Sequence, residues 1–429
     1  MKITRREYPS LREQVYEAQL PSGLTVMAVP RTGWSRYFAI LMTAYGSNDN
    51  QFVLPGETRP TEVPDGIAHF LEHQLFAQPD GSADDRFASL GASSNAFTSW
   101  TRTGYLFSTT GNYQQCLRYL LDFVYQPYFT EAGTAREQGI IQQEIGMFLD
   151  DPRWQVYLNL LQGMYHHHPV RRDIAGSVES VGQVSKQLLD LCYQTFYQPS
   201  NMVLVTVGDF DPEQVLETAA EQMAGKNLAA QPPVQRIFPA EPPSIHRQRT
   251  SLKASVSTPL FALGFKERQP AGRGEDLLRR QVLTEVVLHA VIGSSSALYQ
   301  QLYNEGLIDN SFQSGYSGQP DYGYTVLQGE SKDPERLRDR LLAGLDKLRQ
   351  AGISREDWQR SQRALQGHFL QSLNSMDNLA SDLADVWFDG IDYLHYPDVL
   401  SQLTLDMANQ RLLEHLQPQE AALSEVLPL

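Results

Sequence analysis

The order of apolar and polar residues divides the chain into short strands and longer helices. Two early apolar runs, residues 24–29 and 37–44, are typical of strands, and a turn around residues 30–33 separates them. Residues 94–110 alternate between apolar and polar positions, as in a strand or a hairpin. The further predicted elements are helices at residues 114–125, 131–149, 212–223, 333–350 and 355–376, and a buried strand at residues 202–207.

The two halves of the chain share the same order of predicted elements. Residues 90–124 run through loop, strand, turn, strand and helix, and residues 305–345 repeat this order. Five prolines between residues 229 and 243 predict an extended linker. We therefore predict an α+β fold of two similar domains, each a mostly antiparallel sheet covered by helices on one face. The predicted limits are residues 1–228 for the first domain, 229–246 for the linker and 247–429 for the second domain.

Composition excludes several classes of protein. The 429 residues include 35 basic and 50 acidic side chains, and the formal net charge of −15 argues against a nucleic-acid binder. Cys116 and Cys192 lie in apolar helical patterns, so we expect reduced core residues and no disulfide framework. No run of about 18 apolar residues and no apolar leader occur, which predicts no membrane span and a cytoplasmic location.

The run His69-Phe70-Leu71-Glu72-His73 is the strongest candidate for chemistry. On a helix, two histidines four residues apart leave the same face and can bind one zinc ion. Glu72 lies close enough to act as a base toward a water molecule at that ion. The order H-x-x-E-H inverts the commoner H-E-x-x-H motif of zinc peptidases. The motif alone also fits a solvated helix face, so it needs further support.

A zinc site of this kind needs a third protein ligand from another element. The predicted helix at residues 131–149 contains Glu137 and Glu144, which are seven residues apart and share one face. Either carboxylate is a candidate for the third ligand.

Several motifs together resemble the pitrilysin/insulinase family of zinc peptidases. The first two are HFLEHQLF and, 71 residues after His73, Glu144 within EQGIIQQEIGMFLDDP. The others are NAFTSWTRTGYLFS, HPVRRDIAGSVESV and YQPSNMVLVTVGDFDPEQV. The resemblance covers the first half of the chain and fades in the second half.

The resemblance implies roles for individual residues. His69, His73 and Glu144 would bind Zn²⁺, Glu137 would support the site from behind, and Glu72 would act as the catalytic base. Asn95 and Ala96 would lie on the strand that pairs with an extended peptide substrate.

Two of these residues have plainer interpretations. Asn95 also fits a turn or bulge residue, and Glu137 also fits an exposed helical acid. Manganese or cobalt would fit the same metal ligands in vitro.

The expected function is that of a zinc-dependent endopeptidase acting on peptides or small unfolded proteins. Family enzymes form a two-part clamshell, and this chain has the length of one bacterial-type half. The alternative is a noncatalytic peptide-binding or assembly subunit, although the zinc residues of such subunits are typically lost. The sequence does not distinguish a general endopeptidase from a maturase that trims one dedicated peptide.

The second half departs from the family pattern. It has a lone His289 and no zinc motif, residues 281–335 contain no arginine, and Asp309 stands near the place expected for a tyrosine. Tyr303 and Tyr316 lie nearby without a secure match. We therefore expect a partner, either a related subunit without the zinc motif or a second copy of the chain. The triplet at residues 166–168 is not expected to bind metal, because adjacent side chains point in different directions.

Overall fold

The computed structural model describes residues 1–226, 228 and 230–429, which form two compact units. Unit 1 comprises Met1–Ile145, Arg172–Phe238 and Ser372–Phe388. Unit 2 comprises Gly146–Arg171, Pro239–Gln371 and Asp389–Leu429. The predicted domain limits remain a prediction, and the first linker residue, Ala229, lies outside the described residues.

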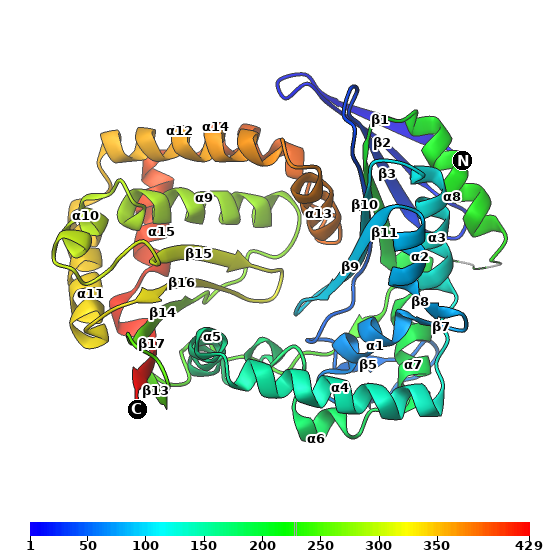
Figure 1. The fold of residues 1–429 in the computed structure, drawn as a ribbon. Coiled ribbons are helices and arrows are strands. Elements are labelled where there is room, and N and C mark those ends of the chain that lie inside the picture. The colour runs from blue at the N-terminus through cyan, green and yellow to red at the C-terminus, as the bar shows by residue number, and fades with distance from the viewer. Residues whose placement is uncertain (227, 229) are drawn as a thin grey trace. The chain divides into compact units, whose positions relative to one another are not determined.

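The main sheet of unit 1 has the strand order β1-β2-β3-β11-β4-β10-β9 within the described residues (Figure 1). All neighbours run antiparallel except β3 and β11, which are parallel. β9 is therefore an edge strand. The strands are β1 (Ile3–Tyr8), β2 (Glu13–Gln19), β3 (Thr25–Pro30), β4 (Tyr37–Thr43), β9 (Ala92–Thr98), β10 (Thr103–Thr109) and β11 (Met202–Gly208). Short pairings add β5 (Gln51–Val53), β6 (Pro60–Glu62), β7 (Ala77–Gln78), β8 (Gly81–Ser82) and β12 (Gln235–Arg236).

The helices of unit 1 cover both faces of this sheet. α3 and α8 pack on β10, β4 and β3, whereas α13 packs on β4 and β11 from the opposite side (Figure 1). Every residue of β11 is buried, as a central strand covered on both faces requires. The prediction of helices on one face was thus wrong for unit 1, because α13 comes from a distant part of the chain. The helices are α1 (Ile67–Leu75), α2 (Ala83–Ser89), α3 (Tyr113–Tyr125), α4 (Glu131–Leu149, which begins in unit 1), α6 (Val178–Val181), α7 (Lys186–Phe196), α8 (Pro212–Ala224) and α13 (Met376–Trp387).

The sheet of unit 2 repeats the strand order seen in unit 1. Its order β13-β17-β14-β16-β15 contains one parallel pair, β13 with β17, and the other neighbours are antiparallel. This matches β3-β11-β4-β10-β9 strand for strand, so the predicted repeat is confirmed. The strands are β13 (Arg249–Ala254), β14 (Leu260–Lys266), β15 (Gln313–Gly318), β16 (Gly323–Glu330) and β17 (Ala421–Pro428). The helices are α5 (Pro152–Met164), α9 (Glu275–Ile292), α10 (Ala297–Asn304), α11 (Pro334–Ala351), α12 (Arg355–Ser372), α14 (Tyr396–Gln402) and α15 (Leu405–His415).

Most predicted elements lie within a residue or two of the observed ones. The exception is the helix predicted at residues 355–376, which ends at Ser372, while α13 begins at Met376 behind the N-cap Ser375. Within the described residues, no single helix has both the length and the apolar character to cross a membrane. The bent pair α9 and α10 passes that test only when its two helices are taken together.

Candidate metal centre

Helix α1 is fixed by packing on the side away from its histidines. Phe70, Leu71 and Leu75 are completely buried and hold the helix in the core of unit 1. The helix begins behind Gly66, whose φ of +87° and whose Cβ position, 2.3 Å from the carbonyl oxygen of Ala175, both require glycine. These constraints set the direction in which the remaining face of α1 points.

That face brings His69 and His73 against Glu144 of α4. Nε2 of His69 lies 3.8 Å from Oε1 of Glu144, and Nε2 of His73 lies 3.5 Å from Oε2 of Glu144. The imidazole rings have centroids 4.6 Å apart. One ligand atom from each residue lies within 4.8 Å of the others, and no other such group occurs among the described residues.

The three side chains fit a zinc ion. Two atoms that each lie about 2.1 Å from one ion at tetrahedral angles are about 3.4 Å apart, close to the separations observed here. Oε2 of Glu144 is buried and has no hydrogen-bond partner among the described residues, so a cation would satisfy it. Two imidazole nitrogens with one carboxylate oxygen form a common donor set for zinc. His69, His73 and Glu144 would hold the ion.

Glu137 orients one of the two histidines. Its Oε1 lies 3.0 Å from Nδ1 of His73, so Nδ1–H donates to the carboxylate and the lone pair of Nε2 is directed away from it. Burial opposes protonation of His73, but the hydrogen bond with Glu137 and the nearby carboxylates raise its pKa. Burial and the neighbouring His73 lower the pKa of His69 to about 3, so this imidazole is neutral. Nδ1 of His69 has no hydrogen-bond partner in the described chain, so packing alone orients that ring.

Glu72 lies beside the three candidate ligands and is held by a different contact. It is only 8% exposed, and its Oε2 accepts a hydrogen bond of 2.7 Å from the hydroxyl group of Thr98 on β9. Burial raises the pKa of Glu72 above its usual value, although the hydrogen bond from Thr98 opposes this shift. The carboxylate is therefore fixed near the centre.

Asn95 and Ala96 lie on the edge strand β9, next to a cavity of unit 1. They pair on one side with Leu106 and Tyr105 of β10. The cavity has a volume of about 1150 Å³, and its lining includes Glu72, His73, Phe76, Asn95, Ala96 and Glu137. The side chain of Asn95 is exposed, and its Oδ1 accepts a hydrogen bond of 2.9 Å from the backbone N–H of Ala96. This local contact fits the plainer interpretation of Asn95, whereas its place beside the cavity fits the substrate role.

Several other residues considered in the sequence have structural contacts instead. Nδ1 of His289 lies 3.0 Å from Oγ of Ser361. The backbone N–H groups of residues 166–168 donate to the carboxylate of Glu241. The hydroxyl group of Tyr316 donates to Glu267 over 3.0 Å. Cys116 and Cys192 are buried and unpaired with each other. None of these residues belongs to a metal-ligand group in the part of the chain that the structure describes.

The sequence did not point to the residues that hold Glu72 in place. The alternation of residues 94–110 puts Thr98 on the same side of the strand as Ala96, but it does not reveal the contact with α1. Loop residues 44–50, which are all buried, support the turn after Thr98 and carried no motif. These contacts join segments that are far apart in the chain, so no local sequence pattern predicts them.

Comparison with known proteins finds a family and several similar chains. Residues 56–178 match the model of the insulinase family, peptidase family M16, and residues 183–365 match that of the peptidase M16 inactive domain. The uncharacterized zinc protease YmfH of Bacillus subtilis is 37% identical over 422 residues, which cover 98% of each chain.

Solved structures show the same architecture. An M16-like peptidase from Alicyclobacillus acidocaldarius is 37% identical and superposes with a TM-score of 0.95, covering 99% of this chain and 100% of the other. The periplasmic protease PqqL from Escherichia coli is 19% identical, with a TM-score of 0.73. This chain covers 47% of PqqL, so that likeness concerns the fold of one half.

Proposed function

Because the chain belongs to the insulinase family, peptidase family M16, we propose that it is a zinc-dependent endopeptidase that cleaves peptides or small unfolded proteins. One observation carries the proposal. Three side chains of suitable type, His69, His73 and Glu144, converge within 4.8 Å beside a buried acid and an edge strand. All of them lie within residues 56–178, the segment that matches the insulinase family model.

The residues of the centre divide the chemistry among themselves. A zinc ion bound by His69, His73 and Glu144 supplies an electrophile that polarises a carbonyl group and acidifies water. Glu72 accepts the proton of the attacking water and passes it to the nitrogen of the leaving amine, so that one carboxylate serves as base and then as acid. Glu137 keeps the lone pair of His73 in place.

The substrate would bind beside this centre as an added strand. The outer edge of β9 offers backbone N–H and C=O groups to an extended peptide, and Asn95 and Ala96 lie in the stretch nearest the cavity. Backbone pairing gives affinity with little sequence preference. Side chains of the peptide would enter the cavity of about 1150 Å³, which is large enough for several of them.

We also propose that a second subunit completes the active site. Residues 281–335 contain no arginine, and the hydroxyl group of Tyr316 is bound to Glu267, so this stretch lacks the substrate-holding arginine expected from the family pattern. The chain covers about half of PqqL, whose two halves form one chain. The partner would be a related chain without the zinc motif or a second copy.

The alternative is a noncatalytic subunit that only binds peptides or assembles with a partner. The description "inactive domain" applies to residues 183–365, which contain none of the proposed zinc ligands. The intact set of His69, Glu72, His73 and Glu144 favours the enzyme.

The test is to measure zinc content and peptide cleavage on the purified chain. The zinc-loaded chain is assayed with a library of quenched fluorescent peptides, alone and mixed with a candidate partner subunit. We expect one zinc per chain and cleavage that increases on addition of the partner. Zinc-loaded protein that cleaves nothing with any related subunit would contradict the endopeptidase proposal. Full activity of a strict monomer would contradict the need for a partner.

A further inference from the structure

Thr98 contacts the proposed catalytic base directly. Its Oγ1 lies 2.7 Å from Oε2 of Glu72, and an ionised carboxylate only accepts hydrogen bonds, so the hydroxyl group of Thr98 is the donor. We propose that Thr98 is a positioning residue, which fixes the Glu72 carboxylate through Oε2 and leaves Oε1 to take the proton of the attacking water. This inference rests on the proposed function, because Thr98 acts only through Glu72.

A second threonine lies beside Thr98 and does not compete with Glu72 for its proton. Thr103 lies directly opposite Thr98 in the pairing of β10 with β9. Oγ1 of Thr103 is 2.9 Å from the carbonyl oxygen of Tyr45 and 3.4 Å from Oγ1 of Thr98. Its single proton goes to the nearer acceptor, the carbonyl group. Thr98 also has one proton, and the Glu72 carboxylate at 2.7 Å is a nearer and stronger acceptor than Oγ1 of Thr103 at 3.4 Å, so Thr98 donates to Glu72.

The turn that follows Thr98 is docked on the loop that contains Tyr45. The backbone N–H of Ser47 donates to the carbonyl oxygen of Ser99 over 3.0 Å, and that of Asn48 donates to the carbonyl oxygen of Trp100 over 2.9 Å. A Cβ atom at Gly46 would lie 2.4 Å from the backbone nitrogen of Thr101, so only glycine permits this approach. The turn that follows β9 is thus tied to the loop by two backbone hydrogen bonds.

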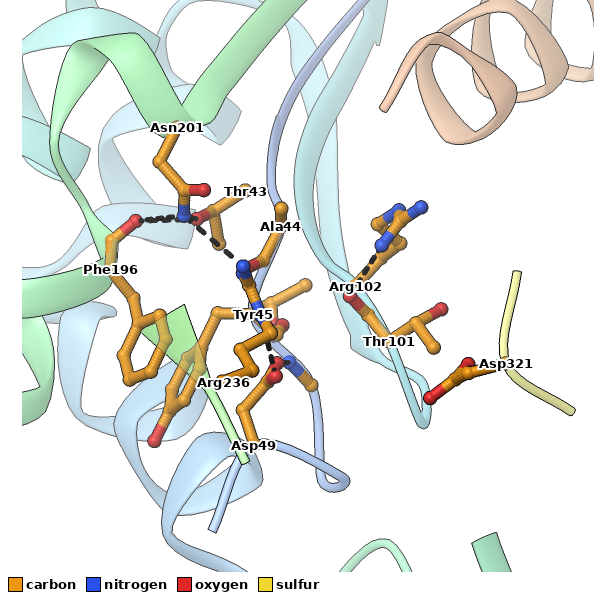
Figure 2. Close-up of polar contacts among 12 residues, drawn as sticks. Thr43, Ala44, Tyr45, Asp49, Thr101, Arg102, Phe196, Asn201, Arg236 and Asp321 are labelled. Atoms are coloured by element: carbon orange, nitrogen blue, oxygen red, sulfur yellow. Dashed lines mark hydrogen bonds and ion pairs between the residues drawn. The ribbon is translucent and has the colours of Figure 1, made fainter. Parts of the chain in front are cut away.

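The loop itself is held by polar contacts that are buried or partly buried (Figure 2). Oδ2 of Asp49 accepts a hydrogen bond of 2.8 Å from the backbone N–H of Gly46, and Oδ1 accepts one of 2.7 Å from Nε of Arg236. Arg236 also donates to the carbonyl oxygen of Ala44, and Asn201 donates to that same oxygen over 3.2 Å (Figure 2). The carbonyl oxygen of Tyr45, which orients Thr103, therefore has a fixed position.

These contacts form a continuous path from a rigid loop to the base. Catalytic groups need positions accurate to about 0.5 Å, and such accuracy comes from supporting hydrogen bonds rather than from the catalytic side chain itself. The plainer interpretation is that Thr98 merely ends a strand and stabilises the fold. The two interpretations differ in what happens to Glu72 when the hydroxyl group is removed.

The variants Thr98→Val and Thr98→Ser separate the two interpretations. Valine keeps the shape of the side chain and removes the donor, whereas serine keeps the donor. For Thr98→Val, in complex with the partner if one is needed, we expect kcat to fall roughly 10- to 100-fold with KM and zinc content unchanged. Thr98→Ser should recover most of that loss. A wild-type kcat in Thr98→Val, or a Thr98→Ser variant as slow as Thr98→Val, would overturn the inference.

Thr109→Val is the matched control. Thr109 lies at the other end of the same hairpin, opposite Ala92, and its hydroxyl group bonds to the carbonyl oxygen of Gly111 over 2.6 Å. This variant also loses a threonine hydrogen bond, but it should keep the wild-type kcat. A drop as large as that of Thr98→Val would assign the effect to the fold of the hairpin.

Crystal structures of the Thr98 variants test the positioning without any turnover. The Glu72 carboxylate should leave its wild-type orientation in Thr98→Val and keep it in Thr98→Ser. If the Glu72 carboxylate keeps its wild-type orientation in Thr98→Val, the inference is overturned, even when the wild-type enzyme proves to be active. Conversely, a wild-type chain that binds zinc and cleaves nothing with any related subunit would refute the proposed function, while the displacement of Glu72 would still support the positioning role.

Discussion

Units 1 and 2 share one strand order but carry different chemistry. Each sheet has its parallel pair at the same place, β3 with β11 and β13 with β17, and each ends in an edge strand, β9 or β15. In unit 1 the chain between β4 and β9 contains α1, a helix of nine residues whose open face carries two histidines. In unit 2 the long helix α9 follows β14 and buries residues on most of its sides, and its one histidine bonds to Ser361. The repeated scaffold therefore does not by itself supply the candidate metal centre, which depends on a few side chains of α1 and α4.

Both units also contain a buried acid that is paired with an arginine, but the residues involved differ. In each unit a buried acid follows the strand that lies next to the parallel pair, Asp49 after β4 and Glu267 after β14. Each acid is paired with an arginine from a distant segment, Arg236 or Arg411. Burial raises the pKa of Asp49, whereas Arg411 and its neighbours overcome burial and hold the pKa of Glu267 well below its usual value.

The largest expected effect is a fall in kcat that follows from changing an acid of unit 1 and not from changing an acid of unit 2. Glu72→Gln removes the base and should lower kcat roughly 10²- to 10⁴-fold while zinc stays bound, because Glu72 is not a ligand. The counterpart Glu285→Gln changes an acid on α9 that accepts a hydrogen bond of 2.8 Å from Tyr396. It should leave kcat and KM unchanged. Steady-state kinetics and zinc content check both variants, and a Glu72→Gln chain with normal turnover would refute the base assignment.

The next effect compares the ion pairs of the two buried acids. Arg411→Met leaves Glu267 without its main partner and should cost about 3–5 kcal/mol of unfolding free energy, since the arginine side chain is only 2% exposed. Arg236→Met should cost less, because Arg236 is 25% exposed and Asp49 keeps its bond from Gly46. Chemical denaturation measures both. The account fails if Arg236→Met is the more damaging change, or if adding Glu267→Gln to Arg411→Met recovers no stability.

A smaller effect concerns the support of the metal. Glu137→Leu removes the acceptor behind His73 and should weaken zinc binding roughly 10- to 100-fold. Gln143→Leu changes an exposed residue of the same helix and should leave the affinity unchanged. Competition with a coloured chelator measures the dissociation constants. Equal zinc affinities of Glu137→Leu and wild type would show that Glu137 is a helical acid that does not support metal binding.

The smallest effect is a pH dependence that belongs to unit 2. Burial would raise the pKa of Glu241, but Lys266 and three backbone N–H groups bring it down to about 2. Because the pKa of Glu241 is lower in the folded chain, its ionised carboxylate stabilises the fold at pH values above 4.5, the usual pKa. This contribution is lost as the pH falls from 4.5 toward 2. Glu241→Gln should reduce the acid-induced loss of unfolding free energy by about 1–2 kcal/mol after allowance for solvent screening. Unfolding curves at several pH values check it, and identical acid sensitivity of variant and wild type would contradict the assignment.

Much of the fold could be predicted from local patterns. Apolar runs placed β3, β4 and β11, and element order revealed the repeat, because these depend on neighbouring residues. The break between α12 and α13 was missed, since amphipathic periodicity continues through Ser375, whose side chain caps the new helix. The covering of the second face by α13 could not be predicted either, because it brings together β4 and residues more than 300 positions later.

The candidate site was predictable to the extent that its residues form motifs. His69, Glu72 and His73 stand on one helix, and Glu137 and Glu144 share a face of another, so helical spacing is enough to group them. Thr98 lies within the motif NAFTSWTRTGYLFS, but the motif assigned no role to it, and Arg236 belongs to no motif. Their contacts arise from strand register and from a buried loop, which only the folded chain determines.

The most direct test is diffraction from zinc-soaked crystals at the zinc absorption edge. The account predicts one anomalous peak in unit 1, bonded to Nε2 of His69, Nε2 of His73 and a carboxylate oxygen of Glu144, with Glu72 unbound. No peak under saturating zinc, or a peak elsewhere with those three side chains apart, would contradict it.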